Sequence, residues 1–265
     1  MTQSTEMRDS VTRRVCAQTG LKIESFPRQQ VWRIAKISYG PMNPRERPEI
    51  AERGDWGRYD VPNHRTIYGA TPRECAYAES LAAQRLKFAP GTHHDLRISE
   101  LFDDDEDVSF HDEIEREWSE RNHMAPGKVA AGWRHERKLY SLQLPAKGYF
   151  VDVEAAASIS AISCALGIEW LTVGALRGED RALTTRVAEW LWHIKLDDGS
   201  SPHGIRYASK HGSDWFCWAV WLRMMDDGGT ASDEPTSADS GAMIESSERN
   251  SPLRKVASMN GLTVF

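Results

Sequence analysis

Isolated polar residues within otherwise apolar segments are the candidates for chemistry in this sequence. Arg33 is embedded in the apolar run 30–38, where an arginine is costly unless it pairs with an acid or binds an anion. Glu79 has small and apolar neighbours, which fits either a solvated helix residue or a placed catalytic acid. Arg58, Tyr68 and Ser209 complete the set. Each of these three also has a structural alternative, because polar residues commonly close turns or sit at the edge of a core.

The segment 54–84 contains three of these candidates and two elements expected to position them. A Gly-rich turn carries Arg58, and the short apolar run 66–69 carries Tyr68. A helix is predicted next, with Thr71 as its N-cap, Pro72 at its first position and Glu74 completing a capping box. This helix carries Glu79.

The remaining candidates depend on elements elsewhere in the chain. Residues 30–38 predict the strand that holds Arg33, and 204–209 predict a short strand or turn that ends in Ser209. The aromatic-rich run 215–221 is interpreted as a core strand. Further strands are predicted at 138–144 and 149–153, and helices at 154–166 and 179–194. This mixture predicts an α+β fold.

Composition limits the classes of partner. The chain has 265 residues and a net charge of -6, so no overall basic field draws it to nucleic acid or to an anionic membrane. The longest uncharged apolar run, 155–168, is too short to span a bilayer. The four cysteines are far apart in the sequence and form no C-x-x-C pair. They favour reduced, buried thiols of a cytoplasmic protein over a disulfide framework or a zinc site.

Three segments are expected to contribute little to the core. Residues 1–27 form a polar lead-in with weak helical periodicity around residues 11–15. Residues 101–121 form a strongly acidic insertion, interpreted as solvated surface rather than a cation site. Residues 226–265 are predicted to be a disordered acidic and Ser-rich tail, so deleting the residues after Asp226 should leave the fold intact. The apolar end 256–265 has three alternatives: docking on the domain, docking on a partner, or fraying.

Several common catalytic motifs are absent from the sequence. It contains no G-x-x-x-x-G-K-[ST] loop, no G-x-S-x-G elbow, no H-E-x-x-H and no G-x-G-x-x-G. These absences argue against P-loop, zinc-hydrolase and Rossmann chemistry.

The chain nevertheless resembles the RES-domain family over residues 28–224. Four segments in the same order carry the resemblance: W-R-I-A at 32–35, G-R-Y-D at 57–60, I-Y-G-A-T-P-R-E-C-A-Y-A-E-S at 67–80 and G-I-R-Y-A-S at 204–209. The family is named for an Arg, a Glu and a Ser, and Arg33, Glu79 and Ser209 stand at the matching places. Trp56 stands where the family commonly has the first glycine of a Gly-Gly-Arg turn.

The resemblance implies an ADP-ribosyltransferase-like split β-sheet core and a bacterial toxin that consumes NAD as its substrate. The implied reaction cleaves the nicotinamide–ribose bond, with phosphate or water as acceptor, and the implied protein partner is an Xre-type antitoxin. Arg33 and Arg58 would bind the diphosphate, Tyr68 would stack on nicotinamide, Ser209 would hydrogen-bond substrate, and Glu79 would stabilise the ribosyl cation. The alternatives are an ADP-ribosyltransferase acting on a protein and a non-enzymatic nucleotide-binding module.

Overall fold

The computed structural model describes residues 11–50, 52–82, 127–230 and 233–265. The acidic insertion 101–121 therefore lies outside the described residues. The chain divides into two compact units, which are described separately. The first unit comprises Met1–Ala76 and Leu139–Ala242, and the second comprises Tyr77–Lys138 and Met243–Phe265. The division falls inside helix α1 (Arg73–Ser80), which begins at the end of strand β4.

A large mixed sheet organises the first unit, so the chain is α+β as predicted. The strand order is β1-β2-β7-β8-β9-β4-β3-β6-β10, and β11 also pairs with β6. Its strands are β1 (Thr12–Val15), β2 (Lys22–Ser25), β3 (Gln30–Lys36), β4 (Thr66–Thr71), β6 (Arg137–Gln143), β7 (Phe150–Asp152), β8 (Gly204–Ser209), β9 (Gly212–Trp221), β10 (Thr236–Ser237) and β11 (Ala242–Met243). The parallel pairing of β7 with β8 separates two antiparallel groups of strands.

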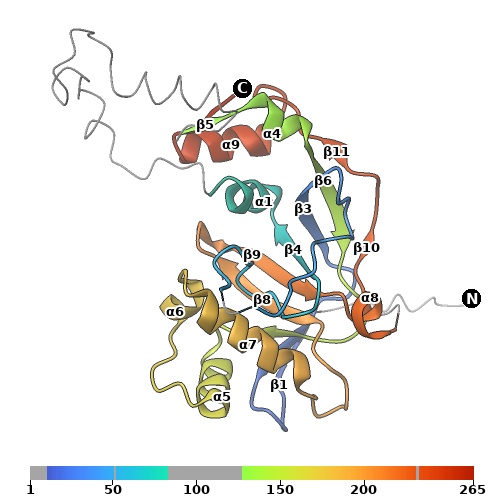
Figure 1. Ribbon diagram of the computed structural model, residues 1–265, viewed down its shortest axis with the longest axis vertical. Helices are drawn as coiled ribbons and strands as arrows, with labels where there is room; N and C mark the ends of the chain where they lie inside the picture. Colours follow the sequence, from blue (N-terminus) through green and yellow to red (C-terminus); the bar gives the residue numbers. More distant parts are fainter. Residues whose placement is uncertain (1–10, 51, 83–126, 231–232) are drawn as a thin grey trace, which may run out of the picture. The chain divides into compact units, whose positions relative to one another are not determined.

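Three helices follow β7 in the chain and lie beside the β8–β9 part of the sheet (Figure 1). They are α5 (Ala156–Leu166), α6 (Val173–Arg177) and α7 (Arg181–His193), and a short helix α8 (Arg223–Asp227) follows β9. Helix α7 contacts β8, and its buried positions repeat with helical spacing, including Val187, Leu191 and Trp192. The Asp180 side chain caps α7 by accepting from the Leu183 amide at 2.9 Å.

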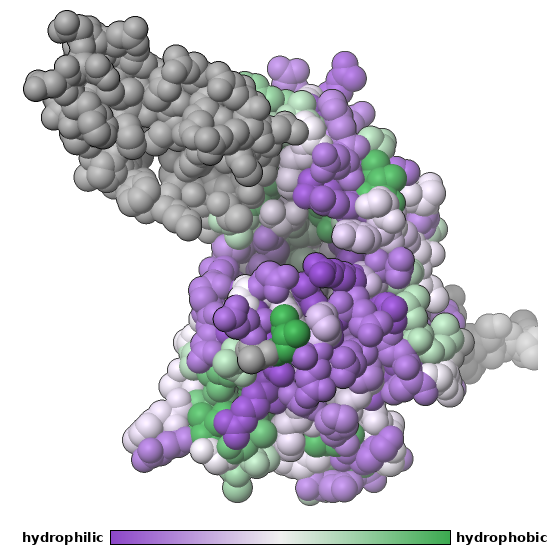
Figure 2. Space-filling model, in the orientation of Figure 1, coloured by the Kyte–Doolittle hydropathy of each residue, from purple (hydrophilic) through white to green (hydrophobic). Residues whose placement is uncertain are grey.

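Aromatic and aliphatic side chains from distant segments form the core of the first unit. The cluster comprises Phe26, Val31, Ile67, Leu142, Leu144, Phe150, Trp218, Val220 and Leu222. Trp215, Trp218 and Trp221 are all buried, which confirms that the aromatic-rich strand belongs to the core. On the side shown in Figure 2, the surface of this unit is mainly hydrophilic and its hydrophobic areas are small.

The second unit is built from short elements at the end of the chain and near residue 130. Strand β12 (Thr263–Val264) pairs in parallel with β5 (Lys128–Val129). Helix α4 (Ala131–His135) follows β5, and α9 (Ser251–Met259) buries Leu253, Val256 and Ala257. The Arg134 guanidinium donates to the carbonyls of Ile244 and Phe265 at 3.2 and 2.6 Å. The C-terminal residues are therefore integral to this unit.

The structure differs from the sequence expectations at both ends of the chain. The lead-in contains the β1–β2 hairpin rather than a helix, and β2 pairs with β7, so residues 12–25 extend the sheet. The tail predicted to be disordered instead contributes β10 to the sheet and α9 to the second unit. Composition failed here because a few apolar residues at suitable spacing, such as Leu253 and Val256, bury one helix face completely.

The cysteines agree with the sequence prediction only in part. None of the four forms a disulfide, and Cys16, Cys75 and Cys217 are buried, whereas Cys164 is exposed. The Sγ atoms of Cys75 and Cys217 lie 3.6 Å apart, although 141 residues separate the two positions in the chain. Within the described residues, no helix has the length and apolarity needed to cross a membrane.

Candidate functional site

The G-R-Y-D turn at residues 57–60 is held rigidly by its own last residue. The Asp60 carboxylate is buried and accepts from the Gly57 amide at 2.8 Å and from the Tyr68 hydroxyl at 2.8 Å. The Arg47 Nε atom donates to the same carboxylate at 2.7 Å. These charge-assisted bonds fix the loop that carries Arg58.

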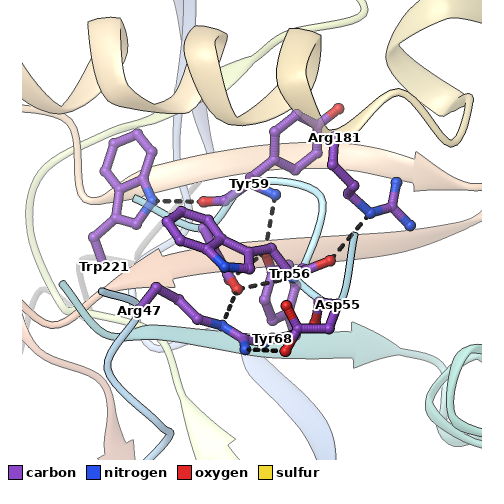
Figure 3. Close-up of polar contacts among 9 residues, drawn as sticks. Arg47, Asp55, Trp56, Tyr59, Tyr68, Arg181 and Trp221 are labelled. Carbon is purple, nitrogen blue, oxygen red and sulfur yellow. Dashed lines mark hydrogen bonds and ion pairs between the residues drawn. The ribbon is translucent and has the colours of Figure 1, made fainter. Parts of the chain in front are cut away.

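Three other elements hold the same turn from outside (Figure 3). The Trp221 indole on β9 donates to the Tyr59 carbonyl at 3.2 Å, and Arg181 on α7 donates to the Trp56 carbonyl at 3.1 Å. The Tyr59 amide donates to the Tyr68 hydroxyl at 2.9 Å. Trp56, directly before this turn, is itself buried in this arrangement.

Tyr68 therefore has a structural task that the sequence did not indicate. Its hydroxyl bridges Asp60 and the Tyr59 amide. Burial and the Asp60 charge raise the pKa of Tyr68 well above its usual value, so the hydroxyl stays protonated and donates to the carboxylate. Stacking of the ring on nicotinamide remains a prediction.

Gly57→Ala should destabilise this site, because an added Cβ would lie 2.5 Å from the Tyr68 hydroxyl oxygen and 2.6 Å from its ring. The ring cannot move without losing both hydrogen bonds, so we expect a loss of about 1–3 kcal/mol in unfolding free energy. Gly54→Ala is the matched control, since nothing lies within 4 Å of its added Cβ. Urea denaturation of both variants measures the difference, and equal stabilities would contradict this packing.

Arg33 lies on β3 as predicted, and its Nε atom is buried with no hydrogen-bond acceptor among the described residues. Burial lowers the pKa of Arg33 to about 10, and Tyr140, Asp60 and Tyr68 partly oppose this effect. The sequence left open that Arg33 pairs with an acid, but no acid among the described residues accepts from its Nε atom. The same interactions place Arg33 within electrostatic reach of Tyr68 and Asp60.

Arg58 is buried and its guanidinium lies 5.2 Å from the centre of the Tyr207 ring on β8. Its positive charge lowers the pKa of Tyr68 slightly against the larger effect of burial, so the two side chains lie within electrostatic reach. Arg33, Arg58 and Tyr68 are thus brought together around Asp60 in the first unit.

The register of three neighbouring strands places two aromatic residues on one face of the sheet. Tyr68 on β4 lies opposite Ala219 on β9, and Cys217, two residues before Ala219, lies opposite Tyr207 on β8. Directly paired residues share a face, as do residues two apart in one strand. Tyr68 and Tyr207 therefore flank the small side chains of β9.

Ser209 ends β8 at a register irregularity and is fully buried. Its Oγ atom accepts from the His211 amide at 3.1 Å, which is the turn-closing role considered as an alternative. Glu154 supports the same strand end, because its carboxylate accepts from the Ala208 amide at 3.2 Å. Arg177 neutralises Glu154 through two bonds of 2.8 and 2.7 Å. A contact between Ser209 and a ligand remains a prediction.

Glu79 lies in the last turn of α1, in the part of the helix that belongs to the second unit. The helix begins at Arg73, two residues after the predicted N-cap, because Thr71 is the last residue of β4. Glu79 is partly buried beside the buried residues Ala78 and Tyr77, so it is not the fully solvated helix residue of the alternative interpretation. Its catalytic role remains a prediction.

Sequence reasoning missed the residues that support the candidates. The sequence shows Asp60 only as part of the G-R-Y-D motif, and it does not mark Tyr207 or Glu154 as candidates. Asp60 ends a glycine-containing turn and Glu154 stands two residues after strand β7, and both acids were available signals. The partners of Glu154 could not be found from local pattern, because Arg177 and Ala208 lie 23 and 54 positions further along the chain.

Comparison of the chain with protein-family models, with curated proteins and with solved structures found no match.

Proposed function

We propose that this protein binds NAD and cleaves its nicotinamide–ribose bond, with phosphate or water as acceptor. The observation that carries the proposal is the partly buried Arg33 side chain, whose buried Nε atom has no acceptor in the described part of the chain. A buried cation of this kind is stabilised by an anionic ligand, and arginine suits the oxygens of a diphosphate. Arg58, buried against Tyr207, supplies a second guanidinium on the rigid turn.

The reaction breaks the C1′–N bond of NAD, and its electron pair leaves with neutral nicotinamide. An oxygen of phosphate or water then bonds to C1′ and gives up a proton when the acceptor is water. The ribosyl group carries positive charge in the transition state, and a nearby carboxylate lowers the energy of that state. We assign this role to Glu79, and we assign the diphosphate to Arg33 and Arg58.

The proposal extends to the fold and to a protein partner. We propose that the mixed sheet of the first unit is an ADP-ribosyltransferase-like core, in which β3, β4, β8 and β9 carry Arg33, Tyr68, Tyr207 and the small residues between them. The resemblance of the sequence to the RES-domain family also supports an Xre-type antitoxin as the protein partner.

Incubation of the purified full chain with NAD tests the function directly. Release of free nicotinamide supports cleavage, and its dependence on added phosphate separates phosphate from water as acceptor. Transfer of label from adenine-labelled NAD onto a protein would instead support an ADP-ribosyltransferase. Binding of NAD with no turnover would overturn the proposed enzyme in favour of a binding module.

Arg33→Met should weaken NAD binding while stabilising the free protein. Loss of a charge-assisted contact costs about 1.5–3 kcal/mol, which is roughly 10- to 150-fold in Kd. Because folding lowers the pKa of Arg33, the charged side chain is less stable in the folded protein than in the unfolded chain. At neutral pH this charge therefore lowers the stability of the fold, and removing it should raise the Tm.

Lys36→Ala is the matched control for Arg33→Met, because Lys36 is an exposed cation at the end of the same strand. Isothermal titration with NAD and a thermal melt measure both effects. An Arg33→Met variant with wild-type NAD affinity would remove Arg33 from the site.

A further inference from the structure

A pocket of about 730 Å³ opens in the first unit, away from the candidate site described above. Its lining residues lie within 146–149 before β7, 195–203 before β8 and 223–230 after β9, together with Asp233, Thr12 on β1 and Ser25 on β2. The candidates Arg33, Arg58, Tyr68 and Ser209 are not among the described residues that line it. The pocket is therefore lined by other residues than those assigned to NAD in the first unit.

His203 lines this pocket and has one ring nitrogen without a partner. The residue is only 4% exposed, and its Nε2 atom lies 2.7 Å from the Lys147 carbonyl oxygen. A carbonyl oxygen only accepts, so Nε2 carries the hydrogen in that bond. Nδ1 is buried and has no hydrogen-bond partner among the described residues. In the neutral ring it therefore presents a lone pair.

Two neighbouring residues fix the ring and supply a second possible ligand atom. Gly148 has φ +87°, and a Cβ there would lie 1.9 Å from His203 Nε2, so only glycine lets the ring reach Lys147. Asp233 Oδ1 lies 4.0 Å from His203 Nδ1. The other oxygen of Asp233 accepts from the Thr230 amide at 3.1 Å, which holds the carboxylate in place.

We propose that His203 Nδ1 and Asp233 Oδ1 together bind a divalent first-row transition metal such as Zn²⁺. In a tetrahedral site with metal bonds of about 2.1 Å, the two ligand atoms lie about 3.4 Å apart, so a small rotation of the Asp233 side chain from the present 4.0 Å would complete the pair. Metal-binding histidines generally donate their other ring N–H to a carbonyl or a carboxylate, as His203 does to Lys147. Imidazole selects zinc-like metals over Mg²⁺ and Ca²⁺.

The nearest buried cation is compatible with this site. Arg223 uses Nε and Nη2 to donate to the carbonyls of Pro202 and Trp192 at 3.2 and 2.8 Å. The carboxylate of Asp227 lies 4.0 Å from its Nη1 atom and offsets its charge.

Titration of the tag-free full chain with Co²⁺ and Zn²⁺ tests the site. We expect one metal per chain, with Co²⁺ showing d–d absorption but no thiolate charge-transfer band. That band would place the metal on thiols such as Cys75 and Cys217 and overturn the proposal. His203→Gln and Asp233→Asn should each weaken binding at least tenfold.

His64→Gln is the matched control, because its Nδ1 atom also lies 3.8 Å from a carboxylate, that of Asp226. Arg65 already pairs with Asp226, so this variant should bind metal normally. If His203→Gln fails to fold, Asp233→Asn still decides, since the Asp233 side chain is 30% exposed. No binding at millimolar metal, or unchanged binding by Asp233→Asn, would overturn the site. NAD cleavage is a separate readout, so either proposal can fail alone.

Discussion

Glu79→Gln is expected to bind NAD with wild-type affinity and to release nicotinamide about 100 to 1000 times more slowly. The substitution keeps the shape of the side chain but removes its negative charge. That charge acts only when the ribosyl group becomes positive, so its loss raises the barrier without weakening ground-state binding. Removing one preorganised electrostatic group typically has an effect of this size.

Glu74→Gln provides a matched control for this experiment, because Glu74 is an acid in the first turn of the same helix. We expect it to retain turnover within a few-fold of wild type. The measurement is kcat and KM for nicotinamide release, together with a thermal melt of each variant. If Glu79→Gln also retains turnover within a few-fold, Glu79 is not the catalytic carboxylate and the proposed mechanism is wrong.

Deletion of every residue after Asp226 should unfold the second unit, contrary to the expectation from composition. The deletion removes Ile244, Leu253, Val256 and Leu262, all of which are buried. Each contributes about 1.5–3 kcal/mol through burial, or roughly 6–12 kcal/mol together. That sum is comparable with the whole stability of a typical domain, about 5–15 kcal/mol. The first unit would also lose β10 from its sheet edge.

Limited proteolysis and urea denaturation of the truncated chain measure this effect. We expect rapid cleavage in the segment 127–138 and a lower denaturation midpoint. A pair of point variants gives a finer test, since Leu253 is fully buried and Arg254 is exposed on the same helix. Leu253→Ala should cost about 2–5 kcal/mol, and Arg254→Ala less than about 0.5 kcal/mol. Wild-type stability of the truncated chain would show that the tail is dispensable.

Local pattern by itself determined most of the central elements. The apolar runs predicted β3, β6, β7 and β9, Ala- and Ser-rich composition predicted α5, and helical spacing of apolar residues predicted α7, with errors confined to a few terminal residues. Such patterns succeed because each element buries one face or stripe, and the repeat of that stripe is written in consecutive residues. The α+β class followed from the same information.

The structure at the ends of the chain depends on contacts between segments that are far apart in the sequence, and no local pattern reveals them. The short strand β2 is stabilised by pairing with β7, and 125 residues lie between Glu24 and its partner Phe150. A polar four-residue strand has no signal of its own, since its hydrogen bonds are completed by a distant partner. Helix α9 was missed for a related reason, because its few apolar residues stand among many polar ones.

The candidate site also has features that the sequence indicates and features that only the tertiary structure decides. Residue type and local context selected Arg33 and Arg58 from the sequence, because a guanidinium in an apolar segment must be compensated. Only the tertiary structure decided that Asp60 accepts from Gly57, Tyr68 and Arg47, and that Tyr207 lies against Arg58. The orientation of a loop depends on hydrogen bonds across strands and helices that meet only in the folded chain, and no local pattern encodes them.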